Sequence, residues 1–287
     1  MSEKIGLVLE GGGVRGGFTA GALAWLNDHN IEFDYGAGIS SGAVYLTCYM
    51  MKNKTAAYNI ATNYACRKDV VGVPALLKEG YYVAYNKLFD DCLKKTEHFV
   101  IDPLIEENPD MEIGLYDLDQ GETVFFRPKE FDHDMKILQG ACALPVASGV
   151  VELNGHHYLD GGITKMIPIE RAIEQGCTKF LVITTKPASY VRKPGSPAVK
   201  VLMKMMYPKY PKMVEDYSIR HLNYYKQIAI IKEQVEKGNA VHVLPSRDFP
   251  VSRFHGDPEV TKVLYKLGYD DMEARKDEIF ALLGITE

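Results

Sequence analysis

Ser40 stands at the centre of Gly38-Ile39-Ser40-Ser41-Gly42, which has the G-x-S-x-G pattern of a nucleophile elbow. In such an elbow a strand turns so sharply into a helix that side chains two residues either side of the serine would collide, so both places need glycine. The turn exposes the hydroxyl for attack on a carbonyl carbon. The pattern therefore predicts Ser40 as an acyl-transfer nucleophile, and the plain alternative for this residue is a helix N-cap.

A glycine-rich loop, Gly11-Gly12-Gly13-Val14-Arg15-Gly16, precedes the elbow. Its glycines leave backbone N–H groups open to a close neighbour, and such groups stabilise the oxyanion that forms when a serine attacks a carbonyl. We therefore expect the oxyanion hole here, from Gly11, Gly12, Gly13, Arg15 and Gly16. The loop also fits G-x-G-x-x-G, but the candidate ribose-binding acid Asp34 precedes the second strand instead of ending it, which disfavours a dinucleotide site.

Asp160 is the candidate base. It follows residues 150–159, which are typical of two short strands about Asn154-Gly155, the strongest short hairpin signal. Gly161 and Gly162 come directly after it. A carboxylate held by flexible backbone at the end of a strand suits a catalytic base and equally a plain turn.

A conventional serine triad would place a histidine after the acid in the chain. His221, His242 and His255 are the histidines that follow Asp160. His221 falls in a predicted long helix and His242 in a buried-strand pattern, so we interpret both as structural. His255, in a predicted loop, stays open as a triad member.

These groups need a sheet to hold them along one edge. Short apolar runs predict buried strands of one sheet at residues 5–9, 35–39, 179–185 and 241–244, and a β pair at 113–127. Helices are predicted at about 18–29, directly after the elbow, across most of 52–112 as a cap, and at about 216–237. The tail after Pro258 is predicted to form two helices broken at Gly268.

The three motifs together resemble the patatin-like phospholipase family, in the family's order and roughly its spacing, over about residues 5–185. The stretch Ala141-Cys142-Ala143-Leu144-Pro145 is also similar to the family's. The resemblance implies an α/β fold, a three-layer αβα hydrolase with a mostly parallel central sheet. Residues 5–185 would be the catalytic core, and 186–287 a mostly helical C-terminal extension that adds a core strand near 240–245.

The resemblance also implies a serine acyl hydrolase that cleaves lipid acyl esters as a phospholipase A, lysophospholipase or esterase. Ser40 would be the nucleophile and Asp160 the base of a Ser–Asp dyad, with no metal and no cofactor. Backbone N–H groups around Gly12 and Gly13 would form the oxyanion hole. Arg15 would support that loop or meet a phosphate, with a solvated loop cation as the alternative.

One departure from the family's pattern follows the dyad loop. Many members carry asparagine shortly before the proline after Asp-Gly-Gly, whereas Met166 and Ile167 precede Pro168 here. A support for the aspartate loop is then missing, which bears on substrate choice or rate. Two other function classes stay open: a non-catalytic lipid-binding protein on the same fold and a dinucleotide-binding oxidoreductase.

Composition sets wider bounds. The chain has 287 residues, 46% of them hydrophobic, which suits a large α/β domain with a sizeable core. Its net charge of −5 gives no reason to expect nucleic acid. Five scattered cysteines without C-x-x-C indicate neither a disulfide framework nor a zinc site. The sequence shows no apolar signal region and no run of membrane-spanning length, which predicts a cytoplasmic protein.

Residues 175–214 contain no Asp or Glu, although the chain as a whole is acidic. Their lysines include Lys200, Lys204, Lys209 and Lys212, interleaved with methionine and tyrosine. Anionic head groups attract such lysines by about 1 kcal/mol each near the surface. We therefore expect peripheral contact with an anionic membrane surface, with a solvated basic face or a protein-contact surface as alternatives.

Overall fold

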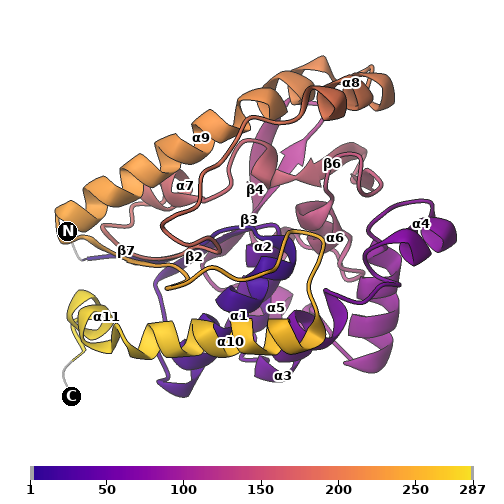
Figure 1. Cartoon of the computed structure of the whole chain (residues 1–287). Coiled ribbons are helices and arrows are strands. Elements are labelled where there is room, and N and C mark those ends of the chain that lie inside the picture. The colour runs from indigo at the N-terminus through magenta and orange to yellow at the C-terminus, as the bar shows by residue number, and fades with distance from the viewer. Residues whose placement is uncertain (1–2, 286–287) are drawn as a thin grey trace.

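A twisted sheet runs through the middle of the computed structural model, which describes residues 3–285 (Figure 1). The strand order is β5-β6-β3-β2-β1-β7-β8. The strand β4 lies outside this order and pairs with β3. Strands β3, β2, β1, β7 and β8 are parallel, whereas β4, β5 and β6 pair antiparallel. The strands are β1 (Ile5–Leu9), β2 (Tyr35–Ile39), β3 (Met111–Asp117), β4 (Glu122–Phe126), β5 (Val151–Leu153), β6 (His156–Asp160), β7 (Lys179–Ile183) and β8 (Ala240–Val243).

The parallel strands are buried on both faces, which explains why they are continuous apolar runs in the sequence. In β1, Leu7 and Leu9 pack into one hydrophobic cluster and Val8 packs into another. In β7, Leu181 and Ile183 join the first cluster, while Phe180 and Val182 join the second. The alternation places helices on both sides of the sheet, so the predicted three-layer αβα fold is confirmed.

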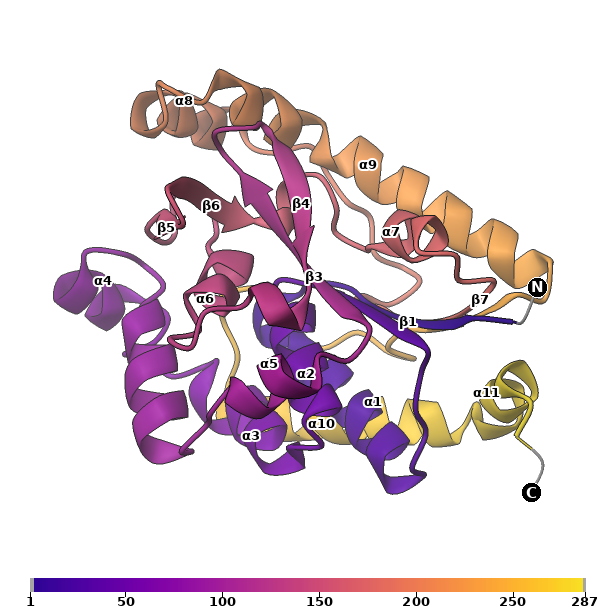
Figure 2. The same ribbon diagram turned by 180° about the vertical axis from the view of Figure 1, so that it is seen from behind.

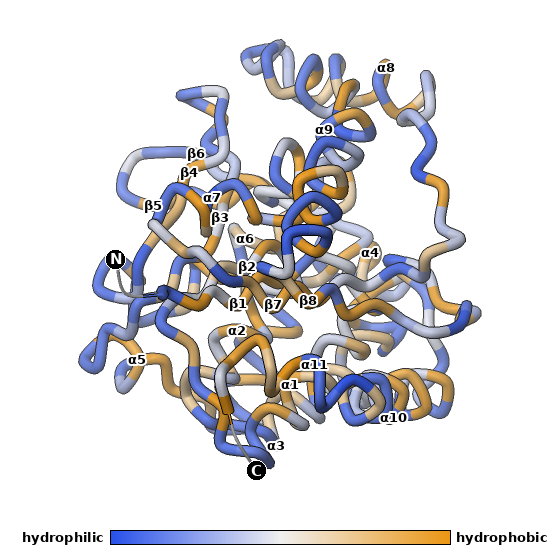
Figure 3. The backbone as a smooth tube through the Cα atoms, turned by 90° about the vertical axis from the view of Figure 1, so that its left-hand side faces the viewer, coloured by the Kyte–Doolittle hydropathy of each residue, from blue (hydrophilic) through white to orange (hydrophobic). Residues whose placement is uncertain are grey.

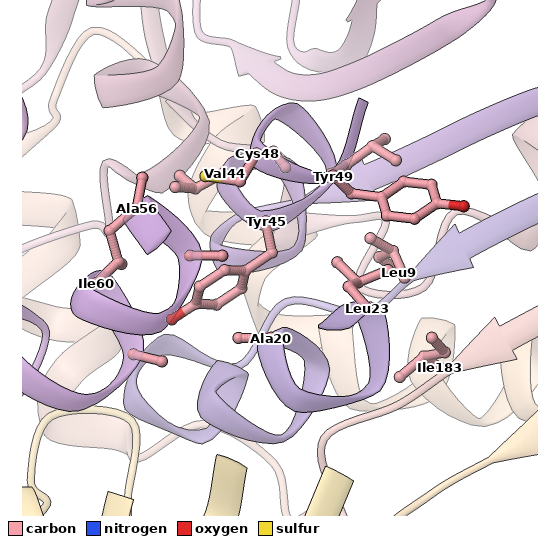
Figure 4. Packing of buried hydrophobic residues seen from close by; sticks show 14 of the residues in the cluster. Leu9, Ala20, Leu23, Val44, Tyr45, Cys48, Tyr49, Ala56, Ile60 and Ile183 are labelled. Atoms are coloured by element: carbon pink, nitrogen blue, oxygen red, sulfur yellow. The ribbon is translucent and has the colours of Figure 1, made fainter. Parts of the chain in front are cut away.

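Helices α7 (Ile169–Glu174) and α9 (Pro211–Glu236) cover one face, and α9 crosses it as a single long rod (Figure 2). The other face is covered by α1 (Gly17–Asp28), α2 (Ser41–Met50), α10 (Pro258–Glu273) and their neighbours. Figure 3 shows the strands β1, β7 and β8 between these two layers. Within the second layer, Tyr45 on α2 is fully buried and lies between Ala20 on α1 and Ile60 (Figure 4).

Helices α1 and α10 cross so closely that their backbones leave no room for a side chain at the crossing. A Cβ on Gly21 would lie 1.8 Å from the Tyr265 carbonyl oxygen, and one on Gly268 would lie 2.0 Å from the Phe18 carbonyl oxygen. The predicted break at Gly268 is therefore wrong: α10 continues through it to Glu273, because the glycine allows contact with α1 and does not end the helix. The break comes at Ala274 and Arg275, before α11 (Lys276–Leu283).

Residues 52–112 are mostly helical, as predicted, and one side of them faces the active-site region. They form α3 (Lys54–Asn59), η2 (Ile60–Tyr64), α4 (Val73–Glu79), η3 (Lys87–Thr96) and α5 (Asp102–Glu107). The remaining helices are α6 (Lys136–Cys142), α8 (Pro197–Met206) and the short turns η1 (Gly13–Gly16), η4 (Pro128–Glu130) and η5 (Gly161–Ile163). Over residues 3–285, none of the helices is long and apolar enough to span a membrane.

Candidate active site

The elbow at Ser40 has the geometry that its glycines predict. Ser40 joins β2 to α2 with φ 56° and ψ −129°, a backbone conformation that is rare for residues other than glycine. A Cβ on Gly38 would lie 2.7 Å from the Gly42 carbonyl oxygen, and one on Gly42 would lie 2.8 Å from the Glu10 carbonyl oxygen. Ser40 occupies the N-cap position of α2, but its side chain forms no capping hydrogen bond. The hydroxyl is thus left for another role.

The carboxylate of Asp160, the last residue of β6, lies beside the elbow and is the candidate partner for this hydroxyl. Ser40 is close enough to the Asp160 carboxylate to affect its pKa, and the Gly162 N–H donates to the carboxylate Oδ1 atom at 2.7 Å. Only 2% of Asp160 is exposed, and this burial raises the pKa of the carboxyl group above its ordinary value. The nearby Ser40 hydroxyl, the Gly162 hydrogen bond and the charge of Arg220 act in the opposite direction. A raised pKa makes this carboxylate a better proton acceptor than an exposed one.

The glycine loop packs against the elbow so closely that side chains are excluded. A Cβ on Gly11 would lie 2.7 Å from Ser40 Cβ, and one on Gly12 would lie 2.7 Å from Thr185 Oγ1. Gly13 has φ 59°, in the left-handed region, and a Cβ there would meet the Arg253 carbonyl oxygen at 2.4 Å. The predicted approach of this loop to Ser40 is therefore confirmed.

The oxyanion-hole prediction needs one refinement. The Gly11 N–H donates to the Met166 carbonyl and the Gly12 N–H donates to Ser41 Oγ at 2.9 Å. Neither is free to receive an oxyanion while those bonds persist. Within residues 3–285, the Gly13 N–H forms no hydrogen bond outside its own helical turn. Gly13 is thus the better candidate donor, whereas Gly16 lies against Tyr45 and Ser41, away from the carboxylate.

A buried ion pair supports the loop from behind. Glu10, fully buried at the end of β1, pairs with Lys186 and also accepts hydrogen bonds from the Thr185 N–H at 2.7 Å and Thr185 Oγ1 at 3.0 Å. Burial lowers the pKa of Lys186 to about 8. Lys186 was predicted to belong to a basic surface, so this placement at the active site corrects that expectation.

The loop after Asp160 is supported from α9. Gln227, which is 1% exposed, accepts from the Ile167 N–H at 3.1 Å and donates to the Thr164 carbonyl at 3.2 Å. Arg220 donates from Nη2 to the Gly162 carbonyl at 3.0 Å. The absence of the family's asparagine suggested that this loop lacks a support, but Gln227 and Arg220 provide one from a distant part of the sequence. The sequence analysis identified neither residue.

Two cavities meet at Ser40. The first is strongly polar and is lined by Gly11, Gly12, Gly13, Arg15, Ile39, Ser40, Leu144, Asp160, Gly162, Met166, Lys186, Tyr190, Arg192, Arg220 and Arg253. The second is apolar and receives side chains such as Val44, Val71, Val83, Tyr85, Leu88 and Phe254, several of them from the predicted cap. Ser40, Leu144, Gly13 and Arg253 line both cavities. The nucleophile candidate therefore lies between a cationic site and an apolar one.

No histidine lines either cavity in the part of the chain that the structure describes. His242 Nε2 lies 2.9 Å from Thr184 Oγ1, and His255 Nε2 lies 3.1 Å from the Tyr82 hydroxyl on the exposed side of its loop. His221 is on α9. The geometry favours a dyad over a triad.

The other sequence-based alternatives find little support. Asp34 accepts a hydrogen bond from the Ile5 N–H at 2.8 Å. It therefore lies at the start of β1, the opposite end of the strand from the glycine loop, and cannot bind the ribose of a nucleotide held there. All five cysteines are free. Asp117, Asp119 and His156 lie close enough to hold a metal ion, but Asp117 Oδ1 already accepts two backbone N–H groups and Oδ2 contacts His156.

The patatin-like phospholipase family matches residues 7–173, which hold both the elbow and the aspartate loop. The chain belongs to this family, a family of acyl hydrolases. A second match, to a domain of unknown function (DUF6363), covers residues 210–284. That region includes α9, β8 and α10, and it contributes Arg220, Gln227 and Arg253 to the site.

One curated relative is an uncharacterized protein, YjjU of Escherichia coli (strain K12), with 26% identity over 196 residues. The match covers 67% of this chain and 54% of the relative, so the chain spans about half the length of that protein. Among solved structures, VipD from Legionella pneumophila is similar in fold, with a TM-score of 0.50 and 13% identity, over 99% of this chain and 70% of that one.

Proposed function

We propose that the protein hydrolyses acyl esters of lipids, with Ser40 as the nucleophile and Asp160 as the base. The observation that supports this most directly is the buried Asp160 carboxylate beside an elbow serine, with both residues lining one cavity. The apolar cavity beside Ser40 suits an acyl chain, because hydrocarbon is favoured where side chains exclude water.

The proposed reaction has two halves. Ser40 Oγ attacks the ester carbonyl carbon while its proton passes to Asp160, and the Gly13 N–H together with the N-terminal end of α2 stabilises the oxyanion. The alcohol then leaves and takes the proton from Asp160. In the second half, water loses a proton to Asp160 and attacks the acyl-enzyme, and Asp160 returns this proton to Ser40 Oγ as the carboxylic acid leaves.

Labelling with a fluorophosphonate separates this proposal from its alternatives. A serine acyl hydrolase forms a covalent adduct, whereas a lipid-binding protein without catalysis and a dinucleotide-binding oxidoreductase do not. We expect the adduct on Ser40 by peptide mapping, and loss of both adduct and ester hydrolysis in Ser40→Ala. An adduct on Ser41, or normal turnover by the alanine variant, would show that the elbow assignment is wrong.

We also propose that α8 contacts an anionic membrane surface. Four apolar side chains of α8 are 41–74% exposed: Val201, Leu202, Met205 and Met206. Lys204 and Lys209 are exposed beside them. In contrast, Met203, Tyr207 and Met213 are buried in a core cluster, so only part of the predicted apolar set is on the surface. Figure 1 shows α8 and α4 at the same end of the molecule, and α4 also exposes Val73 and Leu77.

A further inference from the structure

The polar cavity has far more positive than negative charge. Its lining includes five cationic side chains, Arg15, Lys186, Arg192, Arg220 and Arg253, whereas its only carboxylate is Asp160. One further carboxylate, Glu10, pairs with Lys186 behind the cavity. Even with both carboxylates ionised, the excess is three positive charges.

The arginines have no protein anion to neutralise them. Across residues 3–285, no carboxylate pairs with Arg15, Arg192, Arg220 or Arg253, and the one ion pair at the site is that of Lys186. Arg192 and Arg220 are each only 8% exposed. Burying an unpaired cation is costly unless something compensates its charge. An anion from outside the chain would provide that compensation.

Aromatic rings lie beside these guanidinium groups. Burial raises the pKa of the Tyr217 hydroxyl, but the positive charges of Arg220 and Arg253 outweigh burial and hold this pKa below its ordinary value. Arg192 lies 5.2 Å from the Tyr224 ring centroid, Arg220 lies 4.7 Å from the Tyr217 centroid, and Arg253 lies 5.9 Å from the Phe254 centroid. Arg220 uses Nη2 on the Gly162 carbonyl, but its buried Nε has no hydrogen-bond partner. A buried N–H without a partner, in a side chain that lines this cationic cavity, leaves Arg220 with unused hydrogen-bonding capacity.

The chemistry of such an anion follows from the donors. Arginine forms planar, two-pronged hydrogen bonds with phosphate and carboxylate, and several arginines together favour a multiply charged group. The cavity has a volume of about 40 Å³, and one water needs roughly 10–15 Å³. It therefore accepts a small anion, of the size of a phosphate.

The position of Ser40 decides on which side of the ester the anion lies. Since Ser40 lies where the two cavities meet, an acyl chain in the apolar cavity directs the alcohol of the ester into the cationic cavity. We propose that Arg192, Arg220 and Arg253 form a subsite for a phosphate carried on the alcohol, so that the C-terminal region selects phosphorylated acyl esters. This inference rests on the proposed hydrolase function.

A matched pair of substrates tests the selection: 1-acylglycerol 3-phosphate and 1-acylglycerol with the same acyl chain. We expect the wild type to have a higher kcat/KM for the phosphorylated ester. Arg192→Gln should lower the ratio of the two kcat/KM values about 10- to 100-fold, as expected for a charge-assisted hydrogen bond. Lys193→Gln removes the same charge at the next, exposed position and should leave the ratio unchanged. Equal kcat/KM values for both esters in the wild type would overturn the proposal.

Because Arg192 is buried, its loss can also unfold the chain, so Arg253→Gln, at a half-buried loop position, is the second variant. Both variants are compared with the wild type by circular dichroism before kinetics. A folded Arg253→Gln that keeps the wild-type ratio would count against the subsite.

Inorganic phosphate gives a readout that does not need turnover. Calorimetric titration should show phosphate binding to the wild type and much weaker binding to both variants. Phosphate binding without a preference for the phosphorylated ester would identify a site for free phosphate and overturn substrate selection. No phosphate binding, with Ser40 still labelled by fluorophosphonate, would overturn the subsite and leave the hydrolase proposal standing. Absent labelling and hydrolysis would instead defeat the hydrolase proposal itself.

Discussion

The two matched regions of the chain contribute to the site in different ways. Residues 7–173 bring the proposed reactive groups, Ser40 and Asp160, each inside a short motif whose members are neighbours in the sequence. Residues 210–284 bring Arg220, Gln227 and Arg253, which come from α9 and a loop and share no motif. The comparison teaches that local backbone geometry places the proposed nucleophile, whereas tertiary packing places the charges around it.

Asp160→Asn, in the first region, should have the largest effect on activity of the variants that test this comparison. If the reactive groups all lie in the first region, loss of the base should lower kcat by about 10²- to 10⁴-fold. The adduct with fluorophosphonate should form more slowly for the same reason. Steady-state kinetics on a short-chain ester measures the change.

Histidine variants are the matched controls. His242→Gln and His255→Ala should stay folded and active, because neither side chain lines the cavities. A collapse of activity confined to His255→Ala, with an unchanged circular dichroism spectrum, would restore a triad. It would also place a reactive group in the second region and so break the comparison.

The same contrast explains what the sequence could predict. The strands follow from apolar runs, the hairpin from Asn154-Gly155, and the elbow from Gly38 and Gly42, and all three are local signals. Ser40 and Asp160 were brought together as expected, because β2 ends beside Gly114 of β3 and the antiparallel β6 ends beside the next residue of β3, Leu115.

The arginine cluster could not be predicted in this way. Positions 192, 220 and 253 have no common spacing, and an arginine in a soluble chain is usually on the surface. The one available signal was the lack of acidic residues at 175–214, which we interpreted as a basic surface although Lys186 and Arg192 proved to be buried. The prediction of a helix break at Gly268 was wrong for a related reason, because a glycine inside a helix can indicate either a break or a close helix contact.

Vesicle binding tests α8 and the residues that follow it as far as Lys212. We expect co-sedimentation with anionic vesicles, weaker with zwitterionic ones and weaker in high salt, because salt screens charges on a surface. Replacing Lys200, Lys204, Lys209 and Lys212 by glutamine removes about 1 kcal/mol for each lysine near the surface. Lys212 also pairs with Asp216 at 2.5 Å, so its share should be the smallest.

A charge-matched control changes four exposed lysines on α9 and α10 or at their ends: Lys232, Lys237, Lys262 and Lys266. This variant should still bind anionic vesicles. Binding that ignores lipid charge, or that survives the substitutions on and near α8, would remove the proposed role of this segment.

Gly21→Ala tests how the two regions are held together. Its Cβ would meet the Tyr265 carbonyl at 1.8 Å, and backbone cannot give way as a side chain can, so we expect a loss of about 1–3 kcal/mol in the free energy of unfolding. Gly17→Ala is the control on the same helix. Its Cβ would have ordinary contacts at 3.6 Å, and alanine is favoured over glycine in helices by up to about 1 kcal/mol. Equal stabilities of the two variants in urea unfolding would contradict the close crossing.

The smallest expected effect is a shift in the pH profile, and it tests whether the second region tunes the base of the first. The proposed mechanism needs Asp160 ionised, so kcat/KM should fall as pH decreases through its pKa. Burial raises this pKa, and the positive charge of Arg220 lowers it.

Removing that charge in Arg220→Gln should therefore raise the pKa of Asp160 and move the acid limb of the profile to higher pH. Arg220→Lys keeps a positive charge and should leave the limb close to its wild-type position, although it loses the guanidinium contact with the Gly162 carbonyl. If the two variants shift the limb equally, the effect comes through that contact and not through charge. If neither shifts it, the charges of the second region act on the substrate alone, and the tuning of Asp160 belongs wholly to the first region.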